Sequence, residues 1–94
     1  MNSQTSVIKR DGQRPSENFS KEKLRASILG ACLSVRTPVG QAETTAKSVS
    51  DSVTSWLTSK PEVTSADLRR IAAQHLKTHN PDAAYIYEQH RITI

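Results

Sequence analysis

The fold of this chain is decided by residues 20–35, which read S-K-E-K-L-R-A-S-I-L-G-A-C-L-S-V. Within this stretch the apolar side chains recur at steps of four, three and four, which is the spacing of one face of an α-helix. They are Leu24, Ile28, Ala31 and Val35. Ser20 belongs to the residue types that are favoured at an N-cap. We therefore predict a helix over residues 21–35, and the flanking segments must pack against its apolar face.

A β-hairpin is predicted before this helix. Val7 and Ile8 form the β-branched part of a short strand, and Asp11-Gly12 is typical of a two-residue hairpin turn. Pro15 has no N–H to donate, so the returning strand within residues 13–19 is confined to an edge or a bulge. Residues 1–5 are expected to form a disordered polar tail, and residues 6–94 one domain.

Three more helices are predicted after residue 36. Residues 37–38 (Thr-Pro) supply a cap and a first-turn proline to a long second helix. Residues 62–63 can add a third strand, and residues 64–67 (Thr-Ser-Ala-Asp) resemble a capping box. Residues 80–82 (Asn-Pro-Asp) open a fourth helix. The expected fold is α+β: a short N-terminal hairpin, which a third strand can extend, caps a bundle of four helices.

Composition limits the classes of function. No run approaches the roughly 20 apolar residues of a membrane span, and the polar N-terminus lacks the apolar core of a signal peptide. We therefore expect a cytoplasmic protein with no membrane partner. The single cysteine, Cys32, has no internal disulfide partner and is expected to be buried. His75 and His79 are four residues apart, but no third ligand is evident, so no metal site is predicted.

The positive charge of the chain is localised. The formal net charge is +4, and residues 1–36 contain seven basic and three acidic side chains, whereas residues 37–94 contain six of each. Lys21, Lys23 and Arg25 lie in the first turns of the predicted helix, where each cation is unfavourable by about 0.3–1 kcal/mol. A bound phosphate would offset this cost, with Lys9 and Arg10 of the hairpin reaching the same point. The alternative is a solvated charged face paired with nearby glutamates.

The order of several motifs resembles an ATP-cone domain. Residues 7–12 read V-I-K-R-D-G, residues 17–20 read E-N-F-S, and residues 23–24 read K-L. The resemblance runs over essentially the whole chain, through T-S-A-D-L at residues 64–68 and Y-E-Q-H-R at residues 87–91. Such domains are regulatory nucleotide-binding modules of ribonucleotide reductases and of the transcriptional repressor of their genes. They bind ATP or dATP and perform no chemistry on it, so no enzyme activity is expected.

The resemblance implies roles for ten residues. Cations contact the triphosphate, a carboxylate takes part in base or ribose recognition, and apolar side chains form a slot around the adenine. In that order, the residues are Lys9, Arg10 and Lys23; Glu17; and Val7, Phe19 and Leu24. The three apolar positions equally suit a hairpin-on-helix core. Ser65, Arg69 and Arg91 are further candidates on the third and fourth helices.

The implied function is regulatory binding of ATP or dATP. Occupancy would control association of the chain with itself, as a homo-oligomer, or with a larger protein such as a ribonucleotide reductase or its repressor. Mg²⁺ is compatible with the phosphates as a companion ion. No Cys-x-x-Cys pairs precede the domain and no reductase barrel follows it, so we expect either a free-standing or an excised cone.

Two alternative functions remain. A nucleic-acid-binding helical module would use the same positive charge, but a duplex footprint needs cations along a face, and the second to fourth helices are neutral. Direct nucleic-acid binding is therefore disfavoured. A cone that has lost its ligand and serves as a protein contact is the other alternative, because residues 13–16 form a longer link than is usual and Glu88 stands where arginine often occurs. Trp56, at helical spacing, is assigned to the core.

Overall fold

The computed structural model describes residues 5–8 and 17–89. The elements follow in the order β1 (Ser6–Ile8), β2 (Glu17–Asn18), α1 (Lys21–Ser34), α2 (Val39–Leu57), β3 (Glu62–Thr64), α3 (Ser65–His79) and α4 (Pro81–Gln89). The predicted α+β class and the predicted helices are therefore confirmed. The predicted hairpin turn at Asp11-Gly12 and Pro15 lies outside the described residues.

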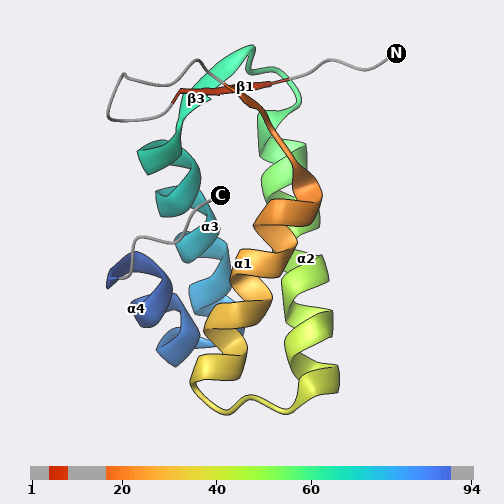
Figure 1. Cartoon of the computed structure of the whole chain (residues 1–94), viewed down its shortest axis with the longest axis vertical. Coiled ribbons are helices and arrows are strands. Elements are labelled where there is room, and N and C mark those ends of the chain that lie inside the picture. The colour runs from red at the N-terminus through yellow and green to blue at the C-terminus, as the bar shows by residue number, and fades with distance from the viewer. Residues whose placement is uncertain (1–4, 9–16, 90–94) are drawn as a thin grey trace.

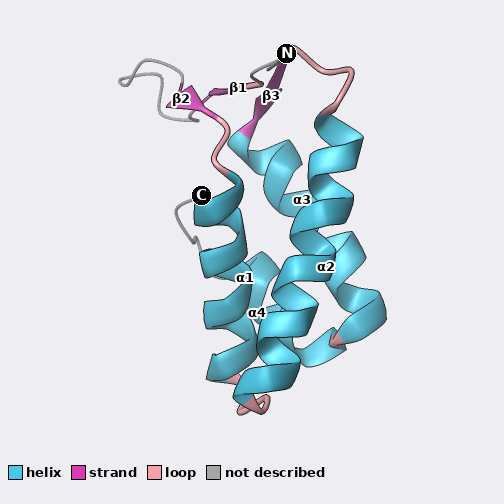
Figure 2. Cartoon of the chain, turned by 90° about the vertical axis from the view of Figure 1, so that its right-hand side faces the viewer, coloured by secondary structure: helices cyan, strands magenta, loops and turns pink. Residues whose placement is uncertain are grey.

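The sheet lies at the end of the molecule where α1 and α3 begin and α2 ends (Figures 1 and 2). Its strand order is β2-β1-β3: β1 pairs antiparallel with β2, and it pairs parallel with β3, with Val7 opposite Val63. The third strand therefore does not extend an antiparallel hairpin. Because α1 leads the chain away from the sheet and α2 leads it back, β3 enters from the same end as β1 and runs alongside it.

Thr5 belongs to the fold and not to the predicted polar tail. Its hydroxyl donates to the Lys60 carbonyl at 2.8 Å, and its own carbonyl accepts from the Phe19 N–H at 2.7 Å. The side chain is buried. These bonds tie the start of β1 to the connection that follows α2 and to the residue that follows β2.

Three of the four predicted helix caps are confirmed. The side-chain oxygens of Ser20, Thr64 and Asn80 accept hydrogen bonds from the backbone N–H three residues later, at 3.2, 3.0 and 3.1 Å. The prediction for Thr37 is wrong, because α2 begins at Val39 without a side-chain cap. The Thr37 hydroxyl instead accepts from Asn80 Nδ2 at 2.9 Å, a bond that ties the α1–α2 connection to the start of α4.

The core is formed by one face of each helix. The largest fully buried side chains include Leu24 and Ile28 of α1, Val49 and Val53 of α2, Leu68 and Leu76 of α3, and Tyr87 of α4. Cys32 is fully buried, as predicted. Trp56 is only half-buried against the core, and the Lys60 ammonium lies 4.7 Å above its ring. In the described residues, no helix has the length and apolar content that crossing a membrane requires.

Candidate functional site

The basic residues at the start of α1 are divided between two sides of the helix. Lys21 forms an ion pair with Asp51 of α2, and Arg25, one turn later, lines a cleft with α2. Lys23 lies about 200° around the helix from Lys21, because each residue advances about 100°. The prediction that these cations converge on one anion is therefore wrong. Of the three, Lys23 is the one that faces away from α2.

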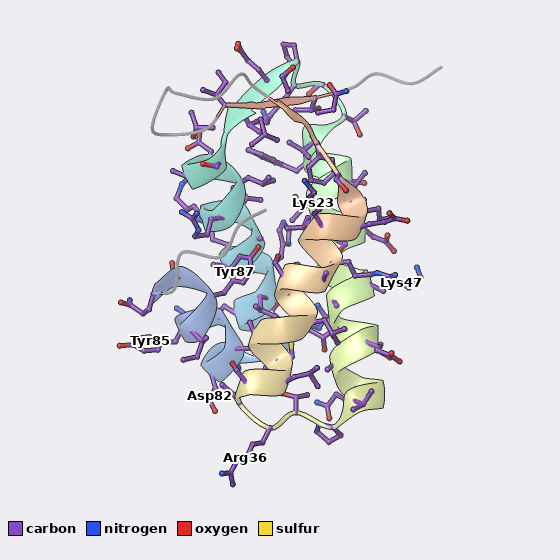
Figure 3. The ribbon with its side chains drawn as sticks, in the orientation of Figure 1. Lys23, Arg36, Lys47, Asp82, Tyr85 and Tyr87 are labelled. Carbon is purple, nitrogen blue, oxygen red and sulfur yellow. The ribbon has the colours of Figure 1, made fainter. Side chains whose placement is uncertain are left out.

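Asp51 is the centre of the charge cluster on the α2 side. Hydrogen bonds from Lys21 and from Lys47, the latter at 2.9 Å, lower the pKa of its carboxyl group to about 2. Lys47 projects outward from α2, on the opposite side of α1 from Tyr87 (Figure 3). Because all three side chains are substantially exposed, this cluster stabilises the helix pair only weakly.

The other side of α1 has a buried pair of hydroxyl groups. Ser27 lies four residues after Lys23, hence on the same side of α1. Its hydroxyl lies 2.9 Å from the Tyr87 hydroxyl of α4 and donates to the Leu24 carbonyl at 2.7 Å. A serine hydroxyl has a single proton, and Ser27 donates it to the Leu24 carbonyl. Tyr87 is therefore the donor in the bond between the two hydroxyl groups. This bond joins α1 to α4 beneath the position of Lys23.

Arg69 of α3 is close enough to Tyr87 for its charge to act on the Tyr87 hydroxyl. Burial raises the pKa of Tyr87, while the positive charge of Arg69 acts in the opposite direction. The Nε atom of Arg69 is buried, and no hydrogen-bond acceptor among the described residues reaches it. A buried donor without an acceptor costs about 1–3 kcal/mol, and more when it belongs to a charged group. A ligand that supplies an acceptor to the Nε atom of Arg69 would therefore remove this cost.

The remaining predicted site residues have different environments. Val7 and Leu24 are buried core residues, and Phe19 is half-buried against the same core. These burials agree with the core interpretation of the three positions; their contact with a base stays a prediction. Ser65 is the first residue of α3 and is half-buried. The side chains of Lys9, Arg10, Glu17 and Arg91 lie outside the described residues.

Sequence reasoning missed Ser27. It is a hydroxyl residue inside the apolar stripe of α1, between Leu24 and Ile28, and a polar residue at such a position must find a partner when the helix packs. That pattern indicates a buried hydrogen bond, but it does not say that the partner is Tyr87, 60 positions away. The same packing brings the charge of Arg69 within electrostatic range of Tyr87.

The other reactive side chains form no centre in the described part of the chain. His75 and His79 are exposed on α3, and within residues 5–8 and 17–89 no three potential metal ligands are grouped. Burial raises the pKa of the Cys32 thiol, which disfavours the reactive thiolate form.

One of three comparisons with known proteins gave a match. The family model described as the ATP cone domain matches residues 5–91, which is nearly the whole chain. Neither the search of curated proteins nor the search of solved structures gave a match. The matched range includes all four helices, the three strands and every predicted site residue. The chain therefore belongs to the ATP-cone family.

Proposed function

We propose that this chain is a regulatory domain that binds ATP or dATP between α1, α3 and α4, next to the sheet. ATP-cone domains are in general nucleotide-binding regulatory domains rather than catalysts. The observation that carries the proposal for this chain is the buried Nε of Arg69, which lacks an acceptor among the described residues. A phosphate oxygen is an acceptor that suits a guanidinium group, since the two form charge-assisted and often bidentate hydrogen bonds.

The start of α1 offers a second group for the phosphates. The backbone N–H groups of a helix N-terminus and its dipole favour an anion, and Lys23 adds a full positive charge in the first turn. Lys9 and Arg10 would contact the triphosphate from the predicted hairpin, with Mg²⁺ as a compatible companion. Glu17 would recognise the base or ribose, and Val7, Phe19 and Leu24 would contact the adenine. Ser65 and Arg91 complete the proposed site.

Nucleotide occupancy would be transmitted through the contact between α1 and α4. Arg69 lies beside Tyr87, and Tyr87 donates to Ser27, so an anion bound at Arg69 changes the electrostatic surroundings of the bond that joins these helices. The output would be a change in association with a second copy or with a larger protein, such as a ribonucleotide reductase or its repressor. We place this regulation in the cytoplasm, with no chemical step performed on the nucleotide.

Isothermal titration calorimetry of the full chain with ATP, dATP and GTP tests the proposal. We expect binding of ATP or dATP, and a roughly tenfold or larger loss of affinity in Arg69→Gln, which corresponds to about 1.4 kcal/mol or more. Arg70→Gln is the matched control, because Arg70 is the neighbouring arginine, is exposed and pairs with Asp67. Absence of heat with millimolar nucleotide, or equal losses in the two variants, rejects the proposal.

A double variant separates this function from nucleic-acid binding. Lys9→Ala combined with Lys23→Ala removes two cations from the proposed triphosphate site. A discrete nucleotide site would lose affinity by orders of magnitude. A diffuse cationic coat would bind nucleic acid only somewhat more weakly and with a smaller dependence on salt.

A further inference from the structure

A cleft lies between α1 and α2, on the opposite side of α1 from the Ser27–Tyr87 pair. Its volume is about 440 Å³, and its apolar lining comes from Ala26 and Leu29 of α1 and Ala46 of α2. We call the surface around it the α1–α2 face. The face extends along both helices towards the connection between them, and it does not include Lys23, Ser27 or Arg69.

Exposed apolar side chains continue the cleft. Leu33 lies one turn after Leu29 on α1 and is 42% exposed, and Val39 lies one turn before Glu43 on α2 and is 60% exposed. The two helices are antiparallel, and the ion pair between Lys21 and Asp51 shows their register, which places Leu33 and Val39 at the same height. The apolar strip is therefore continuous from the cleft to the α1–α2 connection.

The charges around the cleft are balanced. Glu22 and Arg25 come from α1, and Glu43 and Lys47 come from α2, so two acids and two bases line one cleft. Within the described part of the chain, the recorded ion pairs include Lys47 with Asp51 but none of Glu22, Arg25 or Glu43. Three charges beside the apolar strip are thus available to groups on another molecule.

We propose that the α1–α2 face binds the same face of a second copy of this chain. A two-fold interface pairs each residue i with a residue j and each j with i, so acids and bases present in equal number on one face can pair with their counterparts on a second copy. A partner with one dominant charge would leave half of the charges of this cleft unmatched. Balanced charges around an apolar strip therefore favour a second copy as the occupant.

The arrangement that satisfies these charges is a four-helix bundle between two copies. With a two-fold axis parallel to the helices, α1 of each copy packs against α2 of the other, and neighbouring helices are antiparallel. Arg25 then lies about one turn from Glu43 in the second copy, and Glu22 lies within one turn of Lys47. Lys47 is already held by Asp51, which reduces its repulsion with Arg25.

Sedimentation equilibrium of the full chain without nucleotide tests the proposal. We expect a concentration-dependent dimer, and a roughly tenfold or larger rise in its dissociation constant for Arg25→Glu and for Glu43→Arg, because each change places like charges together. Mixing the two single variants should restore dimerisation, because every new contact then joins opposite charges. An effect inside one molecule does not produce this rescue.

Lys77→Glu is the matched control. It makes the same charge change on α3, where Lys77 lines a different groove with Tyr85, and it should leave the dimer unchanged. Circular dichroism establishes that each variant is folded. A chain that stays monomeric at every concentration overturns the proposal. So does a dimer whose dissociation constant is unchanged in Arg25→Glu and Glu43→Arg, or rises equally in Lys77→Glu. Failure of the mixed variants to dimerise overturns it as well. Because nucleotide is absent, these results are independent of the calorimetry.

Discussion

Polar groups on the two sides of α1 differ in whether water can replace their hydrogen-bond partners. On the inner side Ser27 is buried, and its hydroxyl contacts Tyr87 from the far end of the chain. On the outer side Lys21 and Asp51 pair in an exposed cluster, where water can replace either partner. A missing partner is therefore informative on the inner side, where solvent cannot supply one, and this is why the orphaned Nε of Arg69 carries the proposed function.

The largest predicted effect concerns Tyr87. Tyr87→Ala removes a fully buried aromatic side chain and should destabilise the protein by about 3–5 kcal/mol. Tyr85→Ala, two residues earlier on α4, is the control, because Tyr85 is 63% exposed. Urea unfolding of both variants measures the difference. Similar losses in the two would contradict the inner position of Tyr87.

The buried hydroxyl of Tyr87 should also make the stability of the protein depend on pH. Burial raises the folded-state pKa of Tyr87 above its ordinary value of 10.0, so the folded protein resists loss of this proton. The corresponding stability is fully present below about pH 10 and is lost as the pH rises through the folded-state pKa. Tyr87→Phe should remove this alkaline loss and cost about 1 kcal/mol at neutral pH. Unfolding measured from pH 8 to 11 checks both effects, and an unchanged alkaline slope in Tyr87→Phe would argue against them.

A smaller effect, of opposite sign, is expected at Arg69. Arg69→Leu removes a buried donor that has no acceptor among the described residues, so the protein without nucleotide should gain about 1 kcal/mol in stability. The same variant should lose nucleotide affinity. Thermal unfolding with and without ATP measures the two changes together. A variant that is destabilised without nucleotide would show that the Nε atom has a partner in solution.

The sequence predicted the local elements better than the contacts between them. Caps at Ser20, Thr64 and Asn80 depend on residues only three positions apart, and all three form. Thr37 has the right chemistry for a cap, but in the packed fold its hydroxyl accepts a hydrogen bond from Asn80, 43 positions later. A local sequence pattern cannot predict this long-range bond.

In the candidate site too, the sequence predicted individual residues better than the contacts between them. The family motifs predicted Lys23 and Arg69 as site residues, and the structure adds the Ser27–Tyr87 bond beside Arg69. Helical periodicity could have separated Lys21 from Lys23, because residues two apart face different sides of a helix. The pairing of Lys21 with Asp51 could not be predicted without the register of α1 against α2. The parallel pairing of β3 with β1 has the same origin, since it depends on how α1 and α2 return the chain.

Within α1, Gly30→Ala should stabilise the monomer. The new Cβ meets nothing within 4 Å, and the gain in helix propensity is about 1 kcal/mol. For a domain of this size that corresponds to a rise of about 4–8 °C in Tm. Differential scanning calorimetry at low protein concentration measures the monomer. No gain in dilute protein would mean that the glycine is needed within the chain.

The smallest effect is expected for Asp51→Asn, which removes the centre of the outer charge cluster. The folded-state pKa of Asp51, about 2, lies below its ordinary value of 3.8, so its contribution is present above about pH 4 and disappears as the pH falls towards 2. The variant should therefore be slightly less stable than the parent at pH 7 and equal to it near pH 2. Salt should shrink the difference at pH 7, because exposed pairs are screened. A large difference in stability that persists at high salt would show instead that Lys21 and Lys47 are held away from solvent. Water could then not replace a lost partner on the outer side of α1, just as it cannot on the inner side.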